Sequence, residues 1–206
     1  VTVPNTNSFD FKYYNPKPDI PLTFNIISSG TIYWKAQNTA YTTTIEYSLD
    51  NGSTWKSITS NTGSSAPSIS VNAGDVIQFR GDNATYGSDD YSNSFSGSTA
   101  VFDVEGNIMS LIDSTGYTTA TTLASSYTFY YLFGYCTGLT SAENLVLPAT
   151  ILTEFCYGDM FGSCTSLEEA PSLPATILAN NCYEYMFQNC TSLTTAPALP
   201  ATTLAS

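Results

Sequence analysis

The chain of 206 residues contains no histidine, and it has no lysine or arginine beyond Arg80. Without histidine, it lacks the commonest general base, the usual zinc ligand and the base of any Ser-His-Asp or Cys-His arrangement. This absence argues against a hydrolase, and we expect a protein that is not an enzyme.

Positive charge and long apolar runs are also scarce. The formal net charge is −12, with five acidic residues up to position 80 and twelve beyond it. Such a surface repels nucleic-acid phosphates and anionic lipids, and no stretch approaches the roughly 20 apolar residues of a membrane span. We therefore expect neither nucleic-acid binding nor membrane insertion in this segment. The abundance of Thr, Ser, Asn, Tyr and Gly is typical of rigid extracellular β-rich proteins, which predicts a secreted or cell-surface location.

The cysteines are few, odd in number and confined to the second half of the chain. An odd count fits poorly with a closed disulfide framework, and neither a C-x-x-C pair nor a histidine is present to suggest zinc. A buried free cysteine packs as a small apolar residue, so we predict a column of buried thiols. Disulfides between equivalent positions of adjacent repeats are the alternative. The five cysteines are Cys136, Cys156, Cys164, Cys182 and Cys190.

The second half of the chain repeats one phrase every 26 residues. Residues 151–176 read ILTEFCYGDMFGSCTSLEEAPSLPAT, and residues 177–202 read ILANNCYEYMFQNCTSLTTAPALPAT. Residues 118–150 follow the same order with small insertions, and Leu204 opens another copy. A period in this range is typical of a solenoid, in which each unit buries its apolar face against its neighbours. We expect about three repeats over residues 118–206, truncated at the C-terminal end.

Each repeat is predicted to combine a short helix with a short strand. Cys182 and Met186, like Tyr183 and Phe187, are four residues apart, which predicts a helix of about two turns. An extended segment at 190–196 and a proline-bounded turn complete the unit. The predicted repeat core consists of Cys136, Cys164, Cys190, Phe133, Phe161, Phe187, Leu139, Leu167 and Leu193.

The phrase M-F-x-x-C-x-S-L, present at Met160–Leu167 and Met186–Leu193, resembles the BspA-like leucine-rich repeats of Bacteroidales and other gut and oral bacteria. Leu132–Leu139 is a degenerate match. The resemblance covers roughly residues 118–206. It implies a leucine-rich-repeat solenoid in a secreted or surface-anchored protein, often linked to adhesion, and it supplies no catalytic residues.

The first half of the chain has a different pattern. Segments at 22–26, 31–35, 44–49, 68–71, 76–80 and 100–104 alternate apolar and polar residues, which predicts an antiparallel β-sandwich over residues 20–110. Asn51-Gly52 indicates a tight hairpin, and residues 45–55 around it are similar to Ig-like or fibronectin-III-like bacterial surface modules. The fold expected is therefore mainly β: a leader or linker (1–19), an Ig-like sandwich, a junction (111–117) and the solenoid.

Two groups of residues are candidate sites. The polar loop 81–96 places Asp82, Asp89 and Asp90 together, which makes it a candidate calcium site because oxygen-rich loops bind Ca²⁺; no other cofactor is expected. In the same loop, Tyr86 and Tyr91 are candidate ligand contacts on a rigid scaffold. In the solenoid, Glu169 and Thr195 occupy equivalent, variable positions and are expected to flank each other on a binding face.

These observations predict a non-enzymatic adhesion or recognition protein of a gut-type bacterium. Its expected partner is a host or bacterial surface protein or a glycan, bound through the solenoid or the sandwich loops. A receptor-binding fibre component of a phage or prophage is one alternative. A carbohydrate-binding module that stacks sugars on Trp34 and Trp55 is another, although aromatic residues of that size are more often buried in a core.

Overall fold

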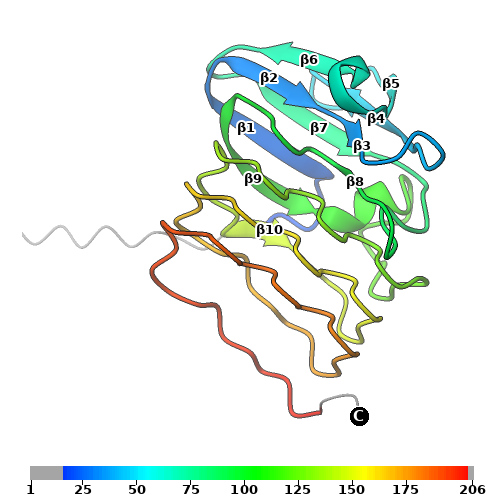
Figure 1. The fold of residues 1–206 in the computed structure, drawn as a ribbon, viewed down its shortest axis with the longest axis vertical. Coiled ribbons are helices and arrows are strands. Elements are labelled where there is room, and N and C mark those ends of the chain that lie inside the picture. Colours follow the sequence, from blue (N-terminus) through cyan, green and yellow to red (C-terminus); the bar gives the residue numbers. More distant parts are fainter. Residues whose placement is uncertain (1–15, 204–206) are drawn as a thin grey trace, which may run out of the picture.

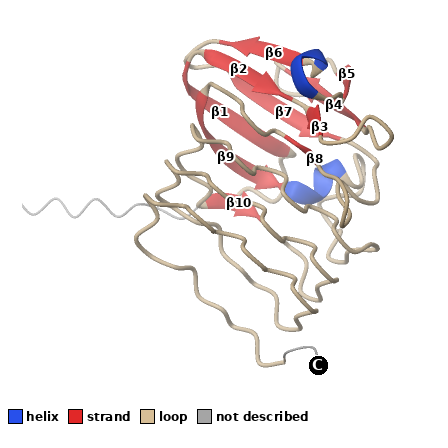
Figure 2. Cartoon of the chain, viewed as in Figure 1, coloured by secondary structure: helices blue, strands red, loops and turns tan. Residues whose placement is uncertain are grey.

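The computed structural model describes residues 16–203 and is mainly β, with almost no helix (Figures 1 and 2). The other strands lie in the first part of the chain, and the later part winds through coils in which β10 is the one strand drawn (Figure 2). The elements are β1 (Leu22–Ser28), β2 (Gly30–Tyr33), β3 (Lys35–Ala36), β4 (Thr44–Ser48), β5 (Lys56–Thr59), η1 (Gly63–Ser65), β6 (Ser68–Val71), β7 (Val76–Arg80), β8 (Asn93–Ser94), β9 (Val101–Asn107), η2 (Ile108–Leu111) and β10 (Asn144–Val146).

The main sheet has six strands in the order β10-β9-β1-β7-β4-β5. All its pairs are antiparallel except β9 with β10. Two further pairs, β2 with β6 and β3 with β8, form small separate sheets. Aromatic side chains fill the space between the main sheet and the two small sheets. The ring centroid of Phe24 on β1 lies 4.8 Å from that of Phe95, and the Phe95 centroid lies 4.9 Å from that of Trp34. All three rings are buried.

The alternating segments of the sequence form strands as predicted. In β6 the side chains of Ile69 and Val71 are buried while their neighbours are exposed, as expected of a strand with one covered face. Each of the six predicted segments overlaps a strand. The β4–β5 hairpin is confirmed, and its turn holds Asn51 and Gly52 at φ of 55° and 82°, the left-handed conformation that this residue pair tolerates.

The repeated half forms three stacked coils, here named coil 1 (122–150), coil 2 (151–176) and coil 3 (177–202). Parallel bridges join Thr122 to Ile151, Ile151 to Ile177, and Ile177 to Thr203, so equivalent positions lie beside each other. Leu204, which corresponds to Leu178 in the repeat, lies outside the described residues. The same succession of coils is visible from yellow to red in Figure 1.

Backbone hydrogen bonds alternate between two kinds along residues 129–136 of coil 1 and 155–164 of coil 2. The N–H of Phe129 donates to Cys156 O in the next coil at 2.8 Å, and Tyr157 donates to Cys182 O at 3.0 Å. The residues that alternate with these donors form bonds within their own coil, as the N–H of Met160 does to Tyr157 O at 3.3 Å. In these two segments half of the N–H donors therefore join neighbouring coils, and the other half close four-residue turns.

The predicted helix at 182–187 is wrong. This segment is a series of turns in which Asn181, Tyr185 and Asn189 have φ between 54° and 58°. A left-handed residue at every fourth position interrupts any helix and leaves bonds three residues back rather than four. The four-residue period of the turns produced the spacing that resembled a helix. The strand predicted at 190–196 is also absent there; among described residues, β10 is the only strand of the coils.

The β-sheet and the coils share one hydrophobic core. Strand β10 of coil 1 pairs with β9, and Phe102 N donates to Gly138 O at 3.0 Å. A Cβ atom on Gly138 would overlap the carbonyl oxygen of Ala100, so only glycine permits this approach. Residues 16–19 of the predicted leader also contact the sheet, because Lys17 pairs with Glu105 at 2.9 Å; residues 1–15 lie outside the described range.

Candidate functional site

The loop predicted to bind a ligand is built into the stack instead. Tyr86 is fully buried, its hydroxyl donates to Leu111 O at 2.5 Å, and its N–H donates to Thr128 O of coil 1. Its ring begins a column that continues through Phe129, Tyr157 and Tyr183. Tyr86 is therefore inaccessible to a ligand, and its expected role as a contact is corrected to that of a core residue.

Phe95 begins the second column at the other end of the same loop. Its ring stacks on Phe133 at 5.9 Å, and its N–H donates to Leu132 O at 2.9 Å. These are the contacts that one coil makes with the next: Phe133 stacks on Phe161 at 5.3 Å, and Phe161 stacks on Phe187 at 5.6 Å. Loop 81–96 thus covers the upper end of the coils.

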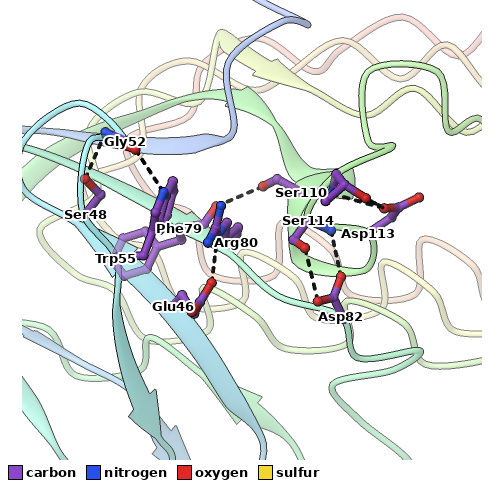
Figure 3. Close-up of polar contacts among 11 residues, drawn as sticks. Glu46, Ser48, Gly52, Trp55, Phe79, Arg80, Asp82, Ser110, Asp113 and Ser114 are labelled. Carbon is purple, nitrogen blue, oxygen red and sulfur yellow. Dashed lines mark hydrogen bonds and ion pairs between the residues drawn. The ribbon is translucent and has the colours of Figure 1, made fainter.

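The three aspartates proposed to bind calcium face different partners. Asp82 accepts hydrogen bonds from the N–H and hydroxyl of Ser114 at 2.8 and 3.1 Å (Figure 3). Asp89 accepts one from the Tyr127 hydroxyl of coil 1, and Asp90 is exposed. Residues 16–203 contain no group of three or more His, Cys, Asp or Glu side chains placed to hold a metal ion. The structure does not bring the predicted ligands together.

The remaining aromatic residues of the loop and of the β-sheet half have neighbours of their own. Tyr91 stacks on Tyr41 at 4.1 Å with nearly parallel rings. Trp34 is buried, and Trp55 carries the guanidinium of Arg80 over its ring at 4.1 Å (Figure 3). Trp34 presents no ring face to a sugar, and Arg80 covers one face of the Trp55 ring, which weakens the support for stacking on these two residues.

Glu169 and Thr195 lie together on the coils. Both line a shallow surface hollow with Glu143, Glu168 and Thr194. Glu169 is half-buried and accepts a hydrogen bond from the Ser141 hydroxyl of coil 1 at 2.9 Å. The hollow is acidic and open, and we find no arrangement in it that selects one chemistry over another.

The residues of the predicted repeat core are buried to different degrees. Cys136, Cys164, Phe133, Phe161, Leu139 and Leu167 are fully buried, Cys190 is 8% exposed, and Phe187 and Leu193 are half-buried at the open end. All five cysteines are free thiols. Burial raises the pKa of each, to about 12 for Cys156. The thiols are packing residues and weak nucleophiles.

A surface that the sequence did not point to lies along the turns of coils 1 and 2. We name it the tyrosine strip. Successive ring centroids along it lie between 4.7 and 6.4 Å apart, and the Tyr135 side chain is 54% exposed. Its members are Phe155, Tyr127, Tyr130, Tyr131 and Tyr135.

The backbone of the turns holds these rings outward. Tyr127, Tyr131, Tyr135 and Phe155 have φ between 52° and 58°, the left-handed region. Glycines make room for the rings between them: a Cβ on Gly134 would lie 2.7 Å from the Tyr131 ring. In coil 3, Tyr185 has the same conformation and is 57% exposed. A repeated signal was present in the sequence, tyrosine at every fourth position, but left-handed tyrosine is too rare for this spacing to be read as a turn.

Carboxylates border the strip and no described base lies on it. Asp159 approaches the Tyr130 hydroxyl at 3.5 Å, and its pKa is raised by partial burial and by the charge of Glu184. Partial burial raises the pKa of Tyr130 too, with Asp159 adding to the shift. Burial raises the pKa of Tyr131 to about 12. The strip offers aromatic faces and hydrogen-bond acceptors in a negative field, which suits hydroxyl-rich or cationic groups and disfavours anions.

Comparison with protein-family models, curated proteins and solved structures gives no match for this chain. Within residues 16–203, no helix has the length and apolarity needed to cross a bilayer.

Proposed function

We propose that this chain is a non-enzymatic recognition protein that works at a bacterial surface, with an Ig-like sandwich followed by a leucine-rich-repeat solenoid. In this proposal the tyrosine strip is the binding surface. The sandwich and loop 81–96 serve as its rigid support.

The observation that carries the proposal is the type of residue at the left-handed positions of the turns. A residue other than glycine costs roughly 1–2 kcal/mol in this conformation, so selection for stability favours glycine or asparagine there. Instead, five of the nine left-handed positions of the coils hold Tyr or Phe, including the exposed Tyr135 and Tyr185. Their rings gain less burial than core rings do. Retaining them at such positions supports a role for the side chains in binding.

The chemistry of the strip defines the ligand class. Flat tyrosine faces stack on the apolar face of a sugar ring, and hydroxyls and carboxylates bond its hydroxyl groups. The net charge of −12 opposes sulfated, phosphorylated or sialylated ligands. We infer that neutral or amino-sugar glycans are bound best.

A glycan array tests this proposal with paired variants. The test variant is Tyr131→Gly/Tyr135→Gly, which removes two rings and leaves a backbone that glycine adopts freely. The matched control is Asn189→Gly, at the position in coil 3 that corresponds to Tyr135, with φ of 58°. The array carries neutral, amino-sugar and sulfated glycans, and urea unfolding monitors the stability of each protein.

We expect the wild type and the control to bind the same neutral or amino-sugar glycans. We expect the test variant to lose binding by about tenfold or more while remaining folded, since an aromatic anchor contributes about 1–2 kcal/mol. Unchanged binding by the folded test variant would contradict the role of the strip. Binding confined to sulfated glycans would contradict the ligand class.

A further inference from the structure

One turn position holds a tyrosine, a carboxylate and a second tyrosine in the three successive coils. The residues are Tyr131 in coil 1, Asp159 in coil 2 and Tyr185 in coil 3, and the carbonyl of each accepts the N–H of the residue three positions later. The N–H of Tyr131 donates to Gly158 O of coil 2, and the N–H of Asp159 donates to Glu184 O of coil 3. The stack therefore places the carboxylate of Asp159 between two aromatic side chains.

The three side chains leave the backbone in the same way. Their φ values are 58°, 50° and 54°, all in the left-handed region. The Tyr131 ring and the Asp159 carboxylate lie over the same turn position, because a Cβ on Gly134 would lie 2.7 Å from the ring and one on Gly162 would lie 2.9 Å from the carboxylate.

The spacing of the coils sets the distance between the two tyrosines. Neighbouring extended chains lie about 4.8 Å apart, so the backbones at Tyr131 and Tyr185 are separated by about 10 Å, with Asp159 midway. A cation held over the Asp159 carboxylate would lie about 5 Å from each ring, within the range of about 6 Å for a cation–π interaction. Tyr185 is 57% exposed, so this ring is open to a ligand.

No basic side chain balances the charge of Asp159. The chain has no lysine or arginine beyond Arg80, and Asp159 forms no ion pair within residues 16–203. The Tyr130 hydroxyl approaches it at 3.5 Å. Partial burial raises the pKa of Asp159, and the charge of Glu184 raises it further. A bound cation would relieve both effects, because it stabilises the ionised carboxylate.

The chemistry of this position fits an organic cation better than a metal ion. The part of the chain that the structure describes has no group of three or more His, Cys, Asp or Glu side chains placed to hold a metal, and a hard metal ion needs more oxygen ligands than one carboxylate provides. An ammonium group needs one carboxylate and benefits from aromatic faces beside it.

We propose that Tyr131, Asp159 and Tyr185 form a subsite for the protonated amine of an amino sugar. This inference rests on the proposed function and names the charged group that the tyrosine strip selects among glycans. An N-acetylated sugar carries an uncharged amide in place of the amine, so it forms neither the ion pair nor the cation–π contacts.

Isothermal titration calorimetry at pH 6 and low salt tests the proposal with three probes. They are a tetrasaccharide of glucosamine, a tetrasaccharide of N-acetylglucosamine, and tetralysine. Asp159→Asn removes the charge and keeps a residue type that occupies left-handed positions elsewhere in the coils, as Asn189 does. Tyr185→Gly removes one ring. The matched control is Glu168→Gln, which removes an exposed carboxylate of the same coil from the acidic hollow. Urea unfolding monitors the stability of each protein.

We expect the wild type and the control to bind the glucosamine probe about tenfold more tightly than the acetylated one. Asp159→Asn should abolish this preference. Tyr185→Gly should reduce it by about threefold, whereas the net charge of the protein acting alone would not depend on that ring.

The other results separate this inference from the proposed function. Equal affinity for the two tetrasaccharides, or a preference that survives Asp159→Asn, would overturn the subsite and leave glycan binding by the tyrosine strip intact. Failure to bind either tetrasaccharide would overturn the proposed function and this inference with it. Tighter binding of tetralysine than of the glucosamine probe would overturn the assignment to a sugar.

Discussion

The thiol of Cys190 donates a hydrogen bond to the main-chain carbonyl of Phe161 at 3.1 Å. Cys164 makes the same bond to Phe133 O, also at 3.1 Å, and Cys136 makes it to Phe95 O at 3.2 Å. The same hydrogen bond from a thiol to a phenylalanine carbonyl therefore continues from the coils into the β-sheet half. There, Phe95 takes the place of the phenylalanine that a preceding coil would provide.

The thiols should be unreactive in the folded protein. Burial raises the pKa of Cys156 to about 12 and also raises the pKa of Cys136 and Cys164. At pH 8 nearly all these thiols are protonated, and the thiolate is the reactive form. We expect no fast labelling by a disulfide reagent under native conditions and five labelled thiols in 6 M guanidinium chloride. Fast native labelling of Cys136 or Cys164 would show that the column is open.

Removing the hydroxyl of Tyr157 should not destabilise the protein. This hydroxyl is buried and has no hydrogen-bond partner in the described structure, while the ring stacks between Phe129 and Tyr183. An unpaired buried polar group costs about 1–3 kcal/mol, so Tyr157→Phe should raise the free energy of unfolding by an amount up to that size. Tyr183→Phe in the same column is the control, with a change within about 0.5 kcal/mol. Urea unfolding measures both, and a loss for Tyr157→Phe would indicate an unseen partner for the hydroxyl.

A methyl group at position 138 should separate the sheet from coil 1. The Cβ of Gly138→Ala overlaps the backbone of Ala100, which cannot move without breaking the contact of β9. We expect a loss of about 1–3 kcal/mol, as for overpacked cores. In Gly162→Ala, the new Cβ meets mainly the flexible carboxylate of Asp159, so a smaller loss is expected. Thermal unfolding of both variants tests the difference, and equal losses would argue against close packing at Gly138.

The β4–β5 turn should contribute a pH-dependent part of the stability. Hydrogen bonds from Thr54 and Ser48 lower the pKa of Asp50 from 3.8 to about 2. A carboxyl whose folded pKa is depressed stabilises the protein above its unfolded pKa, and this contribution is lost as the pH falls towards the folded value. The difference in stability between wild type and Asp50→Asn should therefore be largest above pH 4 and shrink towards pH 2. A difference that stays constant over urea titrations from pH 2 to 6 would rule this out.

The sequence predicted the columns but not the backbone that produces them. A 26-residue period places Phe161 over Phe187 whatever the local conformation, so the stacking could be inferred from the repeats. The turns could not, because a four-residue turn period and a 3.6-residue helix give the same spacing for Cys182 and Met186. In the first half, alternation identified the strands because one face of each strand is covered.

Loop 81–96 as a cover of the coils and the tyrosine strip could not be predicted from the sequence, for different reasons. Tyr86 and Phe95 are nine residues apart, whereas their partners Phe129 and Phe133 are four apart, so the loop carries no trace of the repeat. The position of Tyr131 depends on a left-handed backbone that inter-coil hydrogen bonds impose, and single-residue preferences favour glycine there. Both features arise from tertiary contacts.

The most direct test of the account is the set of ring-to-ring nuclear Overhauser effects among Phe133, Phe161 and Phe187. The stacked coils place these rings 5.3 and 5.6 Å apart between centroids. The account predicts cross-peaks between Phe133 and Phe161 and between Phe161 and Phe187. Absence of both, together with helical i to i+3 contacts within residues 182–187, would contradict it.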